Sequence, residues 1–137
     1  MGSIRNDYSK QKIKIPLIKN MMDYFERKLD DKRRLTIPSE LREEFKSGAV
    51  VTRGFKKYLH LYPVSVWNEL MEPALQGDIL DESIADLNVQ FRTGKTEQSL
   101  DMKQGRVVIE QHLLDYSSIN KDIVAVRAGR YWRLTAS

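Results

Sequence analysis

The stretch KLDDKRRLTIPSELREEF, residues 28–45, contains the pattern on which the interpretation of this chain depends. Five consecutive charged residues, Asp30 to Arg34, lie between a short apolar-alternating run and a proline that begins an amphipathic helix. Two carboxylates and three cations on one tight turn fit either a solvated loop or a loop that contacts nucleic acid. The rest of the sequence has to distinguish these two interpretations.

The residues on either side of this turn predict short strands and one short helix. Pro38 is favoured near the first position of a helix, and Leu41 and Phe45 lie four apart on one helical face before Gly48 ends the segment. The predicted order is strand, turn, strand, helix, strand, turn, strand. The strands are expected at residues 24–29, 34–37, 49–52 and 58–62, and the helix at residues 38–45.

The same order recurs later in the chain. Setting Arg34 against Arg106, a shift of 72, aligns Leu-Thr-Ile at 35–37 with Val-Val-Ile at 107–109. A shift of 73 then aligns Leu61 with Leu134. This internal repeat predicts a second unit of the same type. Its strands are expected at residues 97–101, 106–109, 123–127 and 131–135, and its helix near residues 111–116.

Two further helices are predicted between the units, at residues 66–75 and 81–91, from apolar residues at helical spacing. Four short strands cannot easily enclose a core, so the two units are expected to pair about a pseudo-two-fold axis. The fold class is therefore α+β and mainly β, with the central helices outside as a connection or an oligomer surface. The predicted divisions are a basic arm at 1–20, a first unit at 21–62, a helical connection at 63–95 and a second unit at 96–137.

Composition limits the classes of function. The 137 residues suffice for one domain with a core, and the absence of cysteine excludes disulfides and thiolate nucleophiles, as suits a reducing cytoplasm. No apolar run approaches the ~20 residues of a membrane span. Residues 1–20 carry the whole net charge of +4, because the other 117 residues hold 18 basic and 18 acidic side chains. This segment is either a basic arm that adds phosphate contacts or translation from an upstream start codon.

Other candidate sites lack the required patterns. His60 and His112 have no paired acidic motif and are interpreted as a packed strand histidine and a solvated helix histidine. The Gly-Lys-Thr at 94–96 lacks the upstream glycine of a phosphate-binding loop. The sequence predicts no enzyme, metal, cofactor or small-molecule substrate. Acidic residues near position 80 favour a helix N-terminus, and three large aromatic residues favour packing over base stacking. These residues are Asp78, Asp81, Glu82 and Asp86, and Trp67, Tyr131 and Trp132.

Several separated motifs together resemble the MraZ family of bacterial transcriptional regulators. They are LDDKRRLTIP at 29–38, VVTRGF at 50–55, YLHLYP at 58–63 and KQGRVVI at 103–109. The resemblance covers residues 21–134 and implies two swapped-hairpin motifs of the AbrB/SpoVT type that form a β-barrel-like body. It also implies a homo-oligomeric ring in the cytoplasm, associated with the nucleoid. The ring would bind direct DNA repeats upstream of the division and cell-wall gene cluster, usually as a repressor.

The resemblance places the family's Asp-x-x-x-Arg signature on Asp30 and Arg34. Arginine can bind guanine O6 and N7 with both arms of its guanidinium, worth ~1–3 kcal/mol of discrimination, so Arg34 is the predicted base contact. Lys32 and Arg33 would contact phosphates, and Asp30 would orient Arg34. A plain ion pair on an exposed hairpin, worth ~0–1 kcal/mol, is the competing structural interpretation. With the second turn included, the predicted DNA-binding residues are Asp30, Lys32, Arg33, Arg34, Lys103, Gln104 and Arg106.

Two departures from the family pattern lead to specific expectations. Arg33 stands where family members usually have glycine, so a different geometry is expected for the first turn. In the second unit Asp101 lies five residues before Arg106, not four. Either that loop is one residue longer or the second signature is incomplete.

Two other functions compete with DNA-binding regulation. One is an assembly protein that keeps the ring but no longer reads DNA, which the Arg33 departure and the neutral body would fit. The other is an antitoxin-like swapped-hairpin protein. That alternative would require a neighbouring toxin gene, and a toxin-wrapping tail after Thr135 is not expected.

Overall fold

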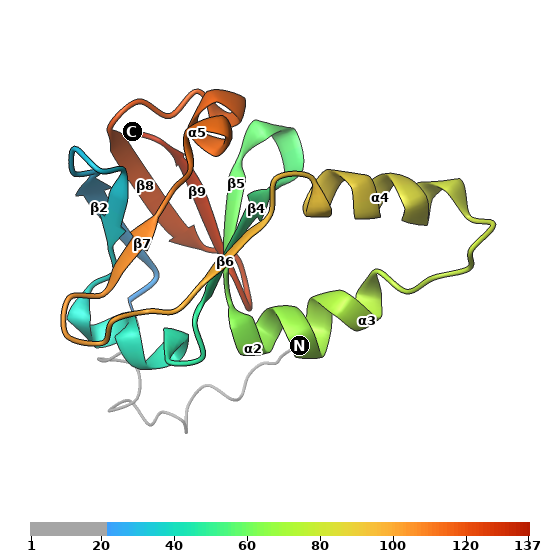
Figure 1. The fold of residues 1–137 in the computed structure, drawn as a ribbon, viewed down its shortest axis with the longest axis horizontal. Coiled ribbons are helices and arrows are strands. Elements are labelled where there is room, and N and C mark those ends of the chain that lie inside the picture. The colour runs from blue at the N-terminus through green and yellow to red at the C-terminus, as the bar shows by residue number, and fades with distance from the viewer. Residues whose placement is uncertain (1–21) are drawn as a thin grey trace, which may run out of the picture.

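The computed structural model describes residues 22–137, so the basic arm predicted for residues 1–20 lies outside the described residues. A β body occupies one end of the molecule, and helical segments project from its other end (Figure 1). The strands of the first half are β2 (Tyr24–Lys28), β3 (Arg34–Thr36), β4 (Ala49–Arg53) and β5 (Leu59–Pro63). Those of the second half are β6 (Thr96–Gln98), β7 (Arg106–Val108), β8 (Asp122–Arg127) and β9 (Trp132–Ala136). The helical segments are η2 (Ser39–Phe45), η3 (Phe55–Lys57), α2 (Val64–Val66), η4 (Trp67–Met71), α3 (Glu72–Ala74), α4 (Glu82–Arg92) and α5 (Gln111–Ser117).

These elements confirm the order predicted from the sequence, with ends that shift by a few residues at most. The segment after Pro38 is helical as predicted, but as a 3₁₀ helix that buries Leu41 and Phe45. Its counterpart α5 is an α-helix that buries Leu113 and Leu114. Each segment follows a short β strand and covers apolar residues, so both halves use their helix in the same way.

Strand pairing crosses between the two halves. The first strand of each half pairs with the third strand of the other, β2 with β8 and β6 with β4. The second strands pair with each other, and so do the fourth, β3 with β7 and β5 with β9. All of these pairs are antiparallel. Neither half therefore completes its own hydrogen-bonded ladder.

The strands do not close into the expected barrel. Within residues 22–137 they form an open six-stranded sheet in the order β2-β8-β9-β5-β4-β6 and a separate two-stranded ribbon, β3-β7. The ribbon strands are only three residues long and pair only with each other. Pro38, which has no N–H to donate, follows the first of them closely. The ribbon thus covers the sheet without joining it.

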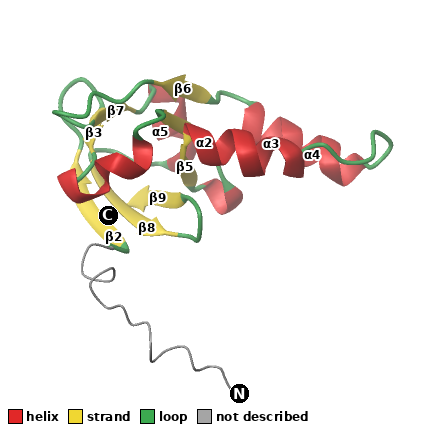
Figure 2. Cartoon of the chain, turned by 90° about the horizontal axis from the view of Figure 1, so that it is seen from below, coloured by secondary structure: helices red, strands yellow, loops and turns green. Residues whose placement is uncertain are grey.

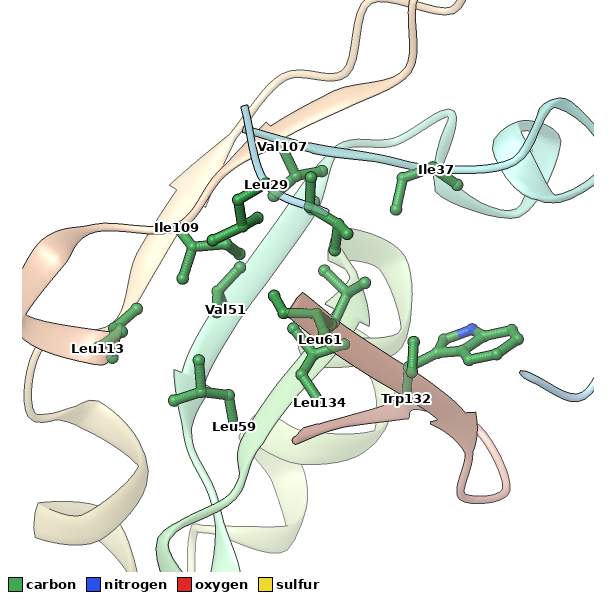
Figure 3. Close-up of a cluster of buried hydrophobic side chains, with 14 of the residues drawn as sticks. Leu29, Ile37, Val51, Leu59, Leu61, Val107, Ile109, Leu113, Trp132 and Leu134 are labelled. Carbon is green, nitrogen blue, oxygen red and sulfur yellow. The ribbon is translucent and has the colours of Figure 1, made fainter. Parts of the chain in front are cut away.

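The main core lies between the sheet, the ribbon and the two short helices (Figure 3). Leu35 and Val107, which are paired across the ribbon, have no exposed surface and point into this core. Trp132 is equally buried, which confirms its predicted packing role. A second cluster joins the helical segments to the sheet. It consists of Val50, Tyr62, Trp67, Leu75 and Phe91.

The helical arm, defined as residues 64–92, extends away from β3 and β7 in both views (Figures 1 and 2). A bidentate ion pair between Glu72 and Arg92 joins its two sides, with contacts of 2.8 and 2.9 Å. The carboxylate of Asp81 accepts the backbone N–H of Ser83 and caps α4, as predicted for this acidic segment. No helix in the described part of the chain has the length and apolar character needed to cross a membrane.

Candidate nucleic-acid interface

The β3-β7 ribbon presents its polar side chains on one outward face. Successive residues of a strand point to opposite sides, and both strands alternate half-buried, buried, half-buried. Arg34 is opposite Val108, and Thr36 is opposite Arg106, so these four side chains share the outer face. The inner positions are apolar and fully buried. Arg34 and Arg106, which come from different halves, therefore lie on one surface. The buried pair of Leu35 and Val107 anchors this surface to the core.

The two arginines lie at diagonal positions of the ribbon. They are two residue steps apart, which corresponds to about 7 Å along the strand direction. The ribbon lies at the end of the molecule away from the helical arm (Figure 1). A two-stranded ribbon can enter the major groove of B-DNA, which is about 12 Å wide. The outer face therefore has a suitable size and chemistry for contacts with base edges.

The first loop, residues 29–33, is organised around Asp30. One carboxylate oxygen accepts the backbone N–H groups of Lys32 at 2.9 Å and Arg34 at 2.8 Å. The other accepts Arg34 Nε at 2.6 Å. Partial desolvation raises the pKa of Asp30, but the hydrogen bonds from Arg34 and Lys32 outweigh it, and the pKa lies below its ordinary value. Asp30 is therefore a carboxylate that fixes both the turn and the arginine.

The predicted Asp30–Arg34 pair is present, and it leaves part of the guanidinium available. Only Nε of Arg34 is engaged, and its two Nη atoms have no hydrogen-bond partner within residues 22–137. The side chain is 27% exposed. Because Nε is held, the direction of the free Nη pair is constrained before any ligand arrives.

The predicted change in turn geometry at Arg33 is wrong. Arg33 has φ of 60°, and Gly105, at the equivalent place in the second loop, has φ of 63°. Ile109 N–H donates to the Arg33 carbonyl at 2.8 Å, and Ile37 N–H donates to the Gly105 carbonyl at 2.6 Å. These reciprocal bonds extend the ribbon at both ends and hold Arg33 in a conformation that non-glycine residues disfavour.

The second loop, residues 99–105, is one residue longer between its aspartate and its arginine. The Asp101 carboxylate accepts Lys103 N–H at 2.9 Å, as Asp30 does for Lys32, and its carbonyl accepts Gly105 N–H at 2.6 Å. The turn is thus preserved with an insertion. The ion pair is not, because Arg106 donates to the side-chain oxygen of Gln104 instead.

The seven predicted residues lie in the two loops and the adjoining ribbon positions. Lys32, Lys103 and Gln104 are exposed, whereas the three arginines are partly buried. Residues 30–34 and 101–106 together carry five cations and three carboxylates. The surface is therefore moderately cationic, with its positive charges on both ends of one ribbon.

Sequence reasoning missed Arg42, a residue of η2 that contacts the second loop. Its Nε donates to the Ile37 carbonyl at 2.9 Å, and Nη1 donates to the Lys103 carbonyl at 2.8 Å. The repeat itself contained a signal for Arg42. The shift of 72 aligns this charged residue with the apolar Leu114, which is a difference between the two halves.

The two histidines lie where the sequence predicted them, one packed in a strand and one exposed on a helix. His60 is 2% exposed within a strand, and His112 is exposed on α5. Burial, with a smaller contribution from the charge of Arg133, lowers the pKa of His60 to about 4, so it is neutral near pH 7. No group of three or more metal-ligating side chains occurs within the described residues.

Comparison with known proteins identifies relatives over most of the chain. A family model described as "MraZ protein, putative antitoxin-like" matches residues 21–82. The transcriptional regulator MraZ of Clostridium acetobutylicum is 38% identical over 98 residues, which are 72% of this chain and 68% of the relative. The chain belongs to the MraZ family. The MraZ regulators of a Roseiflexus species and of Herpetosiphon aurantiacus are 33% and 37% identical and cover 82% and 73% of this chain, and 78% and 69% of their own lengths.

Family membership confirms the resemblance inferred from the separated motifs. The MraZ relatives are named transcriptional regulators, which also confirms that the chain is not an enzyme. The family model ends at residue 82, before the second loop, whereas the Roseiflexus match spans 112 residues.

Proposed function

We propose that this protein is a sequence-specific DNA-binding transcriptional regulator whose β3-β7 ribbon contacts the major groove. The observation that carries the proposal is the diagonal placement of Arg34 and Arg106 on one outward face, with Arg34 oriented by Asp30. An arginine fixed in this way can donate two hydrogen bonds to guanine O6 and N7. Lys32, Arg33 and Lys103 supply charge for neighbouring phosphates.

The protein acts as a ring of several copies on directly repeated sites, as a repressor of the division and cell-wall gene cluster in the cytoplasm. A single ribbon makes too few contacts for tight binding, but linked sites raise affinity through effective concentration. A surface that fits contacts between copies is the tip of the helical arm, where Ile79 and Leu80 are 93% and 88% exposed. Strand exchange between the halves supports a swapped-hairpin architecture with units at 21–62 and 96–137.

The proposal is tested by fluorescence anisotropy with DNA from upstream of the protein's own gene and with scrambled DNA of equal length. The wild type is expected to prefer the upstream DNA, and Arg34→Ala to abolish that preference. Arg130→Ala is the matched control, because Arg130 is an exposed arginine in the turn between β8 and β9. Equal binding of both DNAs by the wild type at moderate salt contradicts the proposal.

An assembly protein without DNA reading is the second candidate. The exposed apolar tip of the arm favours it, together with the neutral charge balance of residues 21–137. This function predicts that Arg34→Ala leaves both DNA binding and regulated expression unchanged. The same anisotropy experiment therefore separates the two candidates.

A further inference from the structure

The second loop is fastened to the body by Arg42. The guanidinium of this residue bridges the Ile37 carbonyl and the Lys103 carbonyl, so it connects the end of β3 to the loop before β7. It occupies the space in which a side chain at Gly105 would lie, since a Cβ there would collide with Arg42 Nε. A side chain at this position would therefore displace the Arg42 guanidinium, in addition to the cost of the positive φ.

The first loop has the opposite arrangement. The position equivalent to Gly105 is Arg33, which has nearly the same φ and the same type of carbonyl hydrogen bond. The residue that the repeat aligns with Arg42 is Leu114, an apolar side chain that is 3% exposed. At each loop one guanidinium is present, supplied by the helix in one case and by the loop in the other.

The two arrangements compete for the same space at a single loop. A Cβ at position 105 already collides with the Arg42 side chain, so an arginine at both places would need two guanidiniums in one space. At the first loop Arg33 needs no such displacement, because the residue at position 114 is leucine. Leu114 and Arg33 line one pocket beside the first loop.

Arg33 is held less firmly than Arg42. Its guanidinium lies 3.6 Å from the Glu110 carboxylate, and its side chain is 41% exposed. Its Nε is buried but has no hydrogen-bond partner among the described residues, so only the end of the guanidinium is exposed. A cation with one long ionic contact and an exposed tip can turn toward a nearby phosphate at little conformational cost.

We propose that Arg42 is the positioning residue of the second loop, and that Arg33 together with Leu114 replaces this clamp at the first loop by a mobile phosphate-contacting cation. The inference rests on the proposed function for its DNA part. It makes the two ends of the ribbon unequal: the second loop is fixed to the body, whereas the first carries an additional positive charge. Arg34, the proposed base contact, lies next to the loop that has the additional cation.

The clamp is tested without DNA by hydrogen–deuterium exchange on the full chain. Arg42→Ala and Arg42→Lys are both expected to speed exchange of the Lys103 and Gly105 amides by about tenfold or more, because neither variant can bridge both carbonyls. The Lys32 and Arg34 amides of the first loop serve as internal controls and should not change. Unchanged exchange in the second loop, or equal acceleration in both loops, overturns the assignment of Arg42.

The reciprocal arrangement is tested by exchanging the parts. Leu114→Arg alone should weaken folding by crowding Arg33, and adding Arg33→Gly should restore folding and slow exchange of the first-loop amides. A double variant no more stable than Leu114→Arg overturns the exchange model.

Anisotropy then addresses the DNA part of the inference. For the double variant, the slope of log K against log salt should become shallower by about 0.9 for each phosphate that Arg33 no longer neutralises. An unchanged slope shows that Arg33 binds no phosphate. Absence of sequence preference already in the wild type is a failure of the proposed function and leaves the exchange results intact.

Discussion

The ribbon end and the helical arm differ in how they are built. The ribbon end arises from two repeats of one pattern, so its outer face carries equivalent arginines related by a pseudo-two-fold arrangement. The arm occurs once, holds six carboxylates and one arginine over residues 64–92, and ends in two exposed apolar side chains. A duplicated surface suits a duplex, whose two strands are related by local two-fold symmetry. A single protruding surface suits head-to-tail contacts between copies, which can close into a ring.

The helical arm meets the sheet beside His60 of β5. This side chain stacks on Tyr131 at 4.3 Å between ring centroids and lies 5.5 Å from Phe91 of α4. It also shares a hydrogen bond of 2.9 Å with the Tyr62 hydroxyl. The contact between arm and sheet therefore includes an aromatic group around one buried histidine, next to the apolar cluster that contains Val50 and Trp67.

The largest expected effect comes from charging the tip of the arm. Ile79→Asp with Leu80→Asp adds two carboxylates to an acidic segment and removes the apolar surface that we expect to lie between copies. Loss of the ring should lower affinity for DNA with several repeats by about 10²–10⁴-fold, because linked binding no longer operates. Affinity for one repeat should stay the same.

Analytical ultracentrifugation measures the size of the assembly. Anisotropy measures affinity for DNA with one repeat (one-box DNA) and for DNA with several repeats. Val126→Asp is the control, since Val126 is a 44% exposed apolar residue of the β body. A double variant that still forms the wild-type assembly would falsify the role of the arm in contacts between copies.

The next effect is a loss of stability in mild acid through His60. Burial lowers its pKa from an ordinary 6.5 to about 4, so the unfolded chain binds a proton in this interval and the folded chain does not. Stability is complete above pH 6.5 and falls as the pH drops toward 4, by up to about 3 kcal/mol. Urea unfolding at fixed protein concentration, repeated from pH 7 to pH 4, measures how the free energy of unfolding depends on pH. His112→Gln should retain it and His60→Asn should lose most of it; the reverse result rejects His60 as the source.

A smaller effect is expected at the root of the arm. The Glu72 carboxylate accepts bonds from Trp67 Nε1 at 2.8 Å and from both Nη atoms of Arg92, and these bonds with Arg92 and Trp67 lower its pKa to about 2. Glu72→Gln should reduce the free energy of unfolding by about 1–2 kcal/mol, since the carboxylate is one-third exposed and screened.

Thermal unfolding by circular dichroism compares this variant with Glu69→Gln, an exposed carboxylate on the same arm. The contribution of Glu72 is complete above its ordinary pKa of 4.5 and disappears as the pH falls toward 2, so the two variants should converge in strong acid. Equal stability at pH 7 would show that the bidentate pair contributes nothing. Affinity for one DNA repeat should be unaffected, because the pair is remote from the ribbon.

Much of the fold follows from local sequence patterns, whereas the partners of the strands do not. Alternating apolar residues and the Pro38 and Gly48 signals locate the elements to within a few residues, because these patterns act on neighbouring residues. Pairing of β2 with β8 joins residues about a hundred positions apart, and the alternation within a strand does not specify its neighbour. The separate ribbon likewise depends on a pairing between the halves, β3 with β7.

The candidate site shows the same limit. The Asp30–Arg34 pair could be predicted because both residues lie in one turn. The left-handed conformation of Arg33 could not, since it is locally unfavourable and is held by a hydrogen bond from Ile109 in the other half. The role of Arg42 also depends on a hydrogen bond across the halves, to the Lys103 carbonyl.

The smallest effect compares two residues with positive φ in different turns of the molecule. Arg33 has φ of 60° at the ribbon end, and Lys56 has φ of 54° in the turn beside α4. Replacing either by glycine removes a left-handed penalty of about 1–2 kcal/mol but increases the entropy of the unfolded chain, so a net gain in stability below about 1 kcal/mol is expected for each. Each substitution also removes one positive charge.

Only the position of the charge then distinguishes the two variants. Arg33→Gly should lower the salt dependence of DNA binding by about 0.9 in log–log slope for each phosphate that is no longer neutralised, whereas Lys56→Gly should leave it unchanged. Anisotropy titrations at several salt concentrations on one-box DNA measure the slopes without a contribution from assembly. Equal slopes for the two variants would mean that the ribbon end attracts DNA through net charge alone. A difference confined to Arg33 would locate a phosphate-binding cation at the first loop and separate the DNA-facing end from the arm.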